Sequence, residues 1–160
     1  GALQTGWVEI AGARFYFDPS TSALHTGWLE TEDGMLYLTT HGVATGVQTI
    51  DGKVYGFDAA TGVRLTDWQE IGGKLYYFNS ESGAAYTGWT AKDGGKLYMT
   101  ENGAASGLIT INGDVYYFNP STFFMQTGWV TVGDTSRYFD PTTGIMTETG
   151  HQAVQLNVVD

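Results

Sequence analysis

Apolar and polar residues alternate in short segments along this chain, and a glycine often separates one segment from the next. The first pair of segments begins at Thr5-Gly6-Trp7 and ends at Phe15-Tyr16-Phe17, with Gly12 between them. Alternation with a period of two is typical of β-strands, and a turn residue between two such strands is typical of a β-hairpin. The pattern therefore predicts that the chain begins with a hairpin.

The hairpin pattern recurs at intervals of 19 to 22 residues. The position of Trp7 is taken in later copies by Trp28, Val47, Trp68, Trp89, Leu108, Trp129 and, in a weaker copy, His151. The three copies that start at Trp28 are followed 61 residues later by three equivalent copies that start at Trp89. Such a short period predicts an all-β array of hairpins over residues 1–150.

The two ends of the chain depart from a complete set of repeats. The sequence starts inside a repeat, and we therefore expect it to be part of a longer protein. Residues 151–160 leave the repeat pattern and are predicted to be a terminal strand or the start of the next module.

Turn residues predict which residues face each other across each hairpin. Asp51-Gly52, Gly72-Gly73 and Asn112-Gly113 favour two-residue loops, because both loop positions require a positive φ. A two-residue loop places the Trp opposite the Tyr nine residues later, which predicts the pairs Trp7–Tyr16, Trp68–Tyr77 and Trp89–Tyr98. Longer turns are expected at residues 32–34 and 133–135, so the sequence leaves the pairing of Trp28 with Tyr37 and of Trp129 with Tyr138 open.

The aromatic pairs have a structural and a functional interpretation. Opposed aromatic residues stabilise a hairpin by roughly 0.2 to 1 kcal/mol, which would account for them without any ligand. The third copy favours a functional role, because Val47 and Gly56 replace both members of the pair. A core is expected to compensate for the lost volume, whereas a binding platform can be absent from one copy.

Polar residues precede several of these platforms by three positions. They are Gln4, His25, Tyr86 and Gln126, whereas Ala44 and Ala105 hold this position in the copies that lack Trp. A sugar ring needs an aromatic surface for its apolar face and polar groups for its hydroxyls. The pattern favours a sugar site, and the alternative is that these side chains cover a turn.

Composition and charge exclude several classes of function. The net charge is −10, with 17 acidic and 7 basic residues, which argues against binding to nucleic acid or to anionic membrane surfaces. No apolar run is long enough for a membrane helix, and cysteine is absent. The histidines His25, His41 and His151 occupy unrelated repeat positions and predict no metal site, and no cofactor is expected. Acidic residues recur at one repeat position and no nucleophile motif is present, so catalysis is not expected.

The repeated unit resembles the cell-wall-binding repeat superfamily. The resemblance rests on Thr-Gly-Trp, a hairpin glycine, the segment Leu75-Tyr76-Tyr77-Phe78-Asn79, then Ser-Gly-Ala-Ala and the next Thr-Gly-Trp, over residues 1–150. This superfamily includes choline-binding modules, glucan-binding domains and the C-terminal repeats of clostridial toxins. It implies a β-solenoid with about three hairpins per turn, ligands held between neighbouring hairpins, and an extracellular or bacterial cell-surface location.

The resemblance also separates two ligand classes. Choline-binding repeats typically carry a further Trp on the second strand, which completes an aromatic box for a quaternary ammonium group. In this chain the second strands offer other residues at the expected position, and one of them, Arg137, would repel a cation. Choline is therefore the second choice of ligand.

The sequence thus predicts a non-catalytic carbohydrate-binding module that tethers a larger extracellular protein to a polysaccharide or surface oligosaccharide. The expected ligand-binding residues are Gln4, Trp7, Tyr16, His25, Trp28, Tyr37, Trp68, Tyr77, Tyr86, Trp89, Tyr98, Gln126, Trp129 and Tyr138. The alternatives are a choline- or teichoic-acid-binding cell-wall anchor and a structural spacer or protein-contact solenoid.

Overall fold

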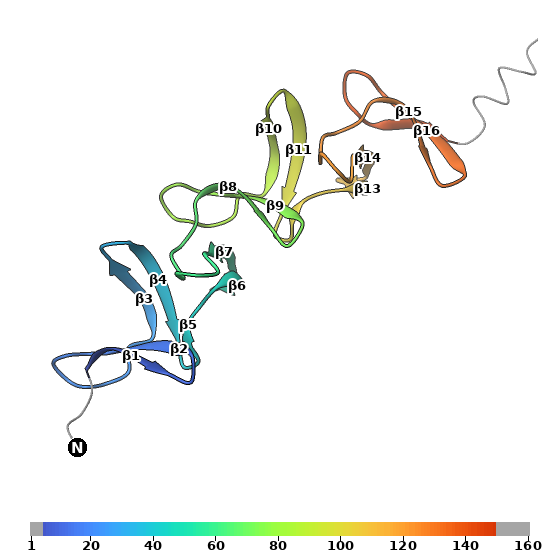
Figure 1. The fold of residues 1–160 in the computed structure, drawn as a ribbon. Helices are drawn as coiled ribbons and strands as arrows, with labels where there is room; N and C mark the ends of the chain where they lie inside the picture. The colour runs from blue at the N-terminus through green and yellow to red at the C-terminus, as the bar shows by residue number, and fades with distance from the viewer. Residues whose placement is uncertain (1–4, 150–160) are drawn as a thin grey trace, which may run out of the picture. The chain divides into compact units, whose positions relative to one another are not determined.

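A computed structural model describes residues 5–149, and its regular secondary structure in this range consists of β-strands that form consecutive antiparallel hairpins (Figure 1). This confirms the predicted all-β architecture of hairpin repeats. The chain divides into two compact units, one ending at Tyr86 and one beginning at Thr87. The predicted single domain over residues 1–150 stays a prediction, and residues 151–160 lie outside the described residues.

Four hairpins make up the first unit, and the second of them carries a short third strand. The strands are β1 (Gly6–Ile10), β2 (Ala13–Phe17), β3 (Gly27–Thr31), β4 (Gly34–Thr39), β5 (Gly42–Val43), β6 (Gly46–Ile50), β7 (Lys53–Phe57), β8 (Asp67–Ile71) and β9 (Lys74–Phe78).

Three hairpins make up the described part of the second unit, and two of them carry a third strand. The strands are β10 (Gly88–Lys92), β11 (Gly95–Thr100), β12 (Gly103–Ala104), β13 (Gly107–Ile111), β14 (Asp114–Phe118), β15 (Gly128–Val132), β16 (Thr135–Phe139) and β17 (Met146–Thr149). None of the described segments forms a helix with the length and hydropathy needed to cross a bilayer.

The hairpin loops set the register that the sequence predicts. Asp51 and Gly52 have φ values of 52° and 80°, as expected for a two-residue loop in which both positions are left-handed. The longer turns expected after Trp28 and Trp129 are wrong, because two residues also separate the paired strands there. The Trp position is therefore opposite the residue nine positions later in all seven described hairpins.

The longer links between hairpins share one hydrogen-bonded turn. In the first link, the backbone N–H groups of Ser20 and Thr21 donate to Oδ1 of Asp18 at 2.7 and 3.0 Å. The N–H of Ala23 then donates to the hydroxyl of Thr21 at 3.2 Å. The same side-chain acceptor recurs at Asp58, Asn79, Asn119 and Asp140. Asp and Asn favour such turns, because their side chains accept hydrogen bonds from nearby backbone N–H groups.

The core lies between successive hairpins, because each hairpin is amphipathic and buries one face on its neighbour. The largest fully buried side chains include Phe57, Phe78, Phe118 and Phe139, which are at most 1% exposed. All four occupy the same position, at the end of a second strand. Burial of one Phe side chain contributes about 1.5 to 3 kcal/mol, so this repeated position accounts for much of the stability.

The aspartates of the links predict how stability depends on pH. The pKa of Asp18, Asp58 and Asp140 lies below its usual value, because each carboxylate accepts two backbone hydrogen bonds. A lowered pKa in the folded state adds stability above the unfolded pKa of about 3.9, and this contribution is lost as the pH falls through the folded pKa. We expect the melting temperature of the wild type to fall as the pH drops below about 4.

The variant Asp18→Asn/Asp58→Asn/Asp140→Asn should show a shallower fall in melting temperature, measured by circular dichroism between pH 7 and pH 2.5. Asn79 and Asn119 already hold the same turn without a charge, so the variant should fold at pH 7. Parallel curves for wild type and variant would contradict the assignment.

Candidate functional site

The structure brings together the three predicted Trp–Tyr pairs and the two pairs that the sequence left open. The ring centroids are 5.1 Å apart for Trp7–Tyr16, 5.0 Å for Trp28–Tyr37, 4.5 Å for Trp68–Tyr77, 5.1 Å for Trp89–Tyr98 and 5.2 Å for Trp129–Tyr138. The pairs differ in exposure: Trp7 and Trp129 are 43% and 40% exposed, whereas the other three indoles are half-buried.

Trp28 and Trp89 are wedged against the following hairpin. The Trp28 ring lies 5.0 Å from Tyr55 and 5.8 Å from Phe57, both on β7. Trp89 repeats this arrangement at 5.0 Å from Tyr116 and 5.8 Å from Phe118, both on β14. Two aromatic rings from one hairpin therefore meet two from the next, and these indoles have a clear structural role.

The same packing accounts for the copy that lacks Trp and Tyr. A Cβ atom on Gly56 would lie 2.7 Å from the Phe78 ring and 3.3 Å from Ile71, so these side chains occupy the space. Val47, opposite Gly56, packs against the cluster of Val54, Tyr76 and Phe78. The lost volume is therefore compensated, as expected for a core, because side chains of the fourth hairpin fill it. The absence of this pair is therefore no argument for a platform.

Local contacts use the polar side chains that precede the platforms. His25 Nε2 lies 3.1 Å from the carbonyl oxygen of Trp28, and the Gln126 side chain donates to the carbonyl of Phe124 at 3.0 Å. Tyr86 is 41% exposed and meets the edge of Tyr77 at 6.2 Å. Gln4 lies outside the described residues. The alternative that these side chains cover turns therefore fits His25 and Gln126.

The alternation of polar residues with alanine at this position also has a structural reason. Ala44 and Ala105 are buried in the clusters that hold Phe57 and Phe118, where a polar side chain would lose its water. Leu65 holds the same position before Trp68 and packs against a buried cluster. The polar residues therefore do not accompany every platform.

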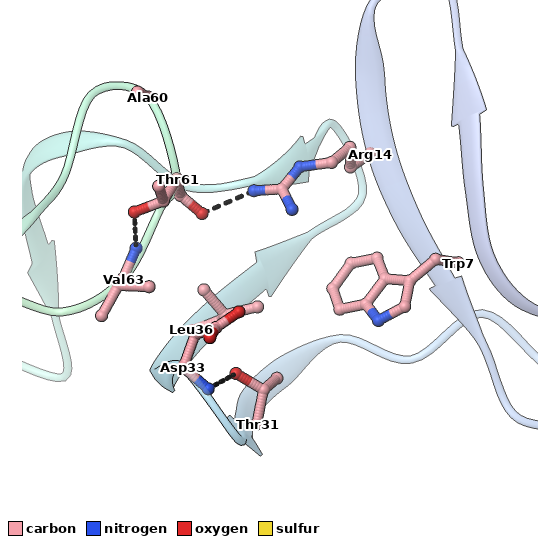
Figure 2. A pocket seen from close by; sticks show the side chains of 8 residues that line it. All are labelled: Trp7, Arg14, Thr31, Asp33, Leu36, Ala60, Thr61 and Val63. Atoms are coloured by element: carbon pink, nitrogen blue, oxygen red, sulfur yellow. Dashed lines mark hydrogen bonds between the residues drawn. The ribbon is translucent and has the colours of Figure 1, made fainter.

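An open pocket lies beside Trp7, with a volume of about 430 Å³. Figure 2 shows the Trp7 indole and the Arg14 side chain on one side of it, with the loop of Thr31 and Asp33 below. Leu36 lines the floor, and the link residues Ala60, Thr61 and Val63 close the far side. The pocket thus joins the first hairpin, the second hairpin and the link that follows the third.

The pocket exists because the second hairpin covers Trp7 with smaller side chains. Leu36 of β4 occupies the position that Tyr55 holds in β7, where it contacts Trp28. Leu36 is only 3% exposed and lacks a ring that could reach across the indole. The exposed face of Trp7 is therefore accessible where the corresponding surface of Trp28 is occupied.

Cationic side chains lie over three of the indole rings, and the sequence did not identify them. Arg14 is 5.5 Å from the centroid of Trp7, Arg64 is 5.5 Å from that of Trp28, and the Lys96 ammonium is 4.8 Å from that of Trp89. These distances are typical of cation–π attraction. Strand register could have indicated Arg14 and Lys96, which share a face with their indoles.

Arg137 holds the second-strand position that Tyr55 holds in β7, from which Tyr55 meets the indole of the preceding hairpin. It pairs with Val130, whereas Trp129 pairs with Tyr138, so Arg137 lies on the opposite face of its strand from the aromatic pair.

A second open groove, of about 460 Å³, lies along Trp89 in the second unit. Its lining includes Lys96 and the backbone of Gly94 and Gly95. Burial raises the pKa of the neighbouring Tyr116 phenol, and the Asp114 carboxylate raises it further, so this ring stays neutral.

Within residues 5–149, no group of three or more His, Asp or Glu side chains is placed to hold a metal ion.

Two family models match the chain. The model described as a choline-binding repeat matches residues 44–88, 65–105 and 105–150, and that described as a putative cell wall binding repeat matches residues 5–20. Comparison with curated protein sequences gave no significant match.

Solved structures from pneumococcus share the fold. CbpJ from Streptococcus pneumoniae TIGR4 is 26% identical with a TM-score of 0.63, over 90% of this chain and 52% of that chain. Choline binding protein F from Streptococcus pneumoniae, in the presence of a peptidoglycan analogue, is 25% identical with the same TM-score and coverage. The chain therefore spans about half the length of these proteins.

The packing of the indoles predicts different costs for two substitutions. Trp28→Ala should remove roughly 2 to 3 kcal/mol of unfolding free energy, because it leaves a cavity against Phe57. Trp7→Ala should remove about 1 kcal/mol or less, because its ring is exposed. Urea denaturation followed by far-UV circular dichroism at pH 7 measures both, and equal losses would contradict the assigned packing.

Proposed function

Since this chain belongs to the choline-binding repeat family, we propose that it is a non-catalytic module which holds a larger extracellular protein on a cell-wall or surface glycan. Membership in the family supports cell-wall binding as the general role. The finer proposal concerns the ligand, which we take to be a saccharide bound in the pocket at Trp7.

The observation that carries this proposal is the composition of the Trp7 pocket. One wall offers an exposed indole, and the others offer the hydroxyls of Thr31 and Thr61, the Asp33 carboxylate and the Arg14 guanidinium. A pyranose ring presents an apolar face and a rim of hydroxyls, which match an aromatic surface and a set of donors and acceptors. The volume of about 430 Å³ lies within the range of small-molecule sites.

Arg14 favours a neutral sugar over choline in this pocket. Its guanidinium lies over the Trp7 ring and donates to the carbonyl of Thr61, which fixes a positive charge at the indole. A quaternary ammonium group in the same place would be repelled by that charge. Sugar hydroxyls can instead accept hydrogen bonds from the guanidinium.

Tethering does not require a tight individual site. Several modest sites on one chain give a much higher overall affinity for a polymer, because later contacts become intramolecular. The groove at Trp89 and the exposed Trp129 are candidates for further contacts of this kind.

Choline remains the second candidate ligand, because the charge of the whole chain favours it. The net charge of −10 attracts cations. Choline binding would place the chain among cell-wall anchors that recognise teichoic acid.

Intrinsic tryptophan fluorescence during titration tests the proposal. The probes are a peptidoglycan tetrasaccharide-pentapeptide of the kind used with choline binding protein F, an α-glucan oligosaccharide and choline chloride. We expect saturable quenching or a spectral shift with a saccharide, and at least a tenfold loss of affinity in Trp7→Ala. Ile10→Ala is the control, because it removes an exposed apolar side chain of the same hairpin that does not line the pocket.

Leu36→Tyr supplies a second test that keeps Trp7 in place. The new ring should cover the indole as Tyr55 covers Trp28, so we expect saccharide binding to fall at least tenfold while the fold persists. A saccharide response that both Trp7→Ala and Leu36→Tyr leave unchanged would refute the pocket. A response to choline alone would establish the second candidate.

A further inference from the structure

Trp28 and Trp89 occupy equivalent positions, 61 residues apart, yet their cations come from different elements. Arg64, over Trp28, lies in the link after β7. Lys96, over Trp89, lies on β11, the second strand of the hairpin that carries Trp89. Two different arrangements therefore place a cation over equivalent indoles within one chain.

The two arrangements differ in which of two neighbouring positions holds the cation and which holds a methionine. The residue equivalent to Lys96 in the first block is Met35, and the residue equivalent to Arg64 in the second block is Met125. The two positions are joined by the backbone, because Arg64 N–H donates to the Met35 carbonyl at 2.8 Å and Met125 N–H donates to the Lys96 carbonyl at 2.7 Å. Each block thus has one cation and one methionine at this pair of positions.

Arg64 is held in place by more than the indole. Its guanidinium donates to the carbonyl of Glu81 at 3.1 Å, in the link after the fourth hairpin. A Cβ atom on Gly83 would lie 2.4 Å from Nε of Arg64, so glycine at this position lets the side chain pass. The arginine therefore bridges Trp28 and a link more than fifty residues further along the sequence.

We propose that Arg64 and Lys96 are specificity-determining residues: each acts as an internal cation on its indole and excludes quaternary ammonium ligands from Trp28 and Trp89. This inference concerns different residues from the saccharide pocket at Trp7 and does not depend on it.

Electrostatic repulsion and preorganisation both exclude an external quaternary ammonium group from these indoles. The π face of Trp attracts one cation, and a second cation brought to the same ring meets the charge of the first. The internal cation needs no translational ordering, because the chain already holds it, so an external ammonium group has to displace a preorganised competitor. Methionine at the same positions is uncharged and flexible and would present no such competitor.

Replacement of both cations by methionine gives a direct test by choline titration. Arg64→Met and Lys96→Met are made together in one variant, and tryptophan fluorescence and isothermal calorimetry record binding of choline chloride. We expect choline to bind this variant at least tenfold more tightly than the wild type, because Arg64 and Lys96 no longer lie over the two indoles. Addition of Met35→Lys to the variant should restore exclusion at Trp28, because it copies the arrangement at Trp89.

A conservative variant and a spectroscopic measurement complete the test. Arg64→Lys keeps the cation and should leave choline binding at the wild-type level, while far-UV circular dichroism confirms that each variant is folded. In the wild type, NMR should show the Lys96 ε-methylene resonances shifted upfield by the indole, and Trp89→Phe should reduce this shift. Wild-type binding of choline as tight as that of a folded double variant, or the absence of the ring-current shift, would overturn the proposal.

Discussion

The contact between one hairpin and the next is the interaction on which the rest of this structure depends. A two-stranded hairpin in isolation is marginally stable, so each one needs a neighbour to cover its apolar residues. Here the aromatic pair of one hairpin receives the Phe and Tyr side chains of the following hairpin, as Trp28 receives Tyr55 and Phe57. The Trp–Tyr face of one hairpin therefore packs against the opposite, Phe-bearing face of the next, and the two faces form one interface. Whether an indole is buried or exposed depends on which side chains the next hairpin places against it.

This constraint explains how an open pocket and a packed core can occur at equivalent positions of one repeat. The indole position serves the core where the next hairpin supplies Tyr and Phe, and it opens into a pocket where Leu36 stands in for Tyr55. In the third hairpin no aromatic residue holds these positions, and Gly56 leaves space for the Phe78 ring of the fourth hairpin. One backbone plan thus gives three outcomes at equivalent positions, and each outcome is set by a side chain about one repeat further on.

The sequence predicted the strands and three of the Trp–Tyr pairs, because these depend on local alternation and on turn residues such as Asp51-Gly52. The loops after Trp28 and Trp129 are shorter than it predicted. The sequence could not show which platforms were covered, because that depends on contacts between hairpins. The argument from Val47 and Gly56 failed for this reason: the compensating ring of Phe78 lies in another repeat. Arg64 was missed because it lies in a link whose path over Trp28 no strand period encodes. Comparison of the two 61-residue blocks could have pointed to it, since cation and methionine change places between them.

The face-to-face contact has a consequence for how such a chain can grow. Its two surfaces differ, so the contact is head-to-tail, and a head-to-tail contact that does not close on itself can be extended without limit. Insertion of another 61-residue block would leave the contacts within each unit intact, because there the described contacts join a hairpin to its immediate successor. A gene encoding this fold can therefore change its number of repeats by duplication or loss without redesigning any core. The number of hairpin surfaces becomes a property of copy number, adjustable without changing a single side chain.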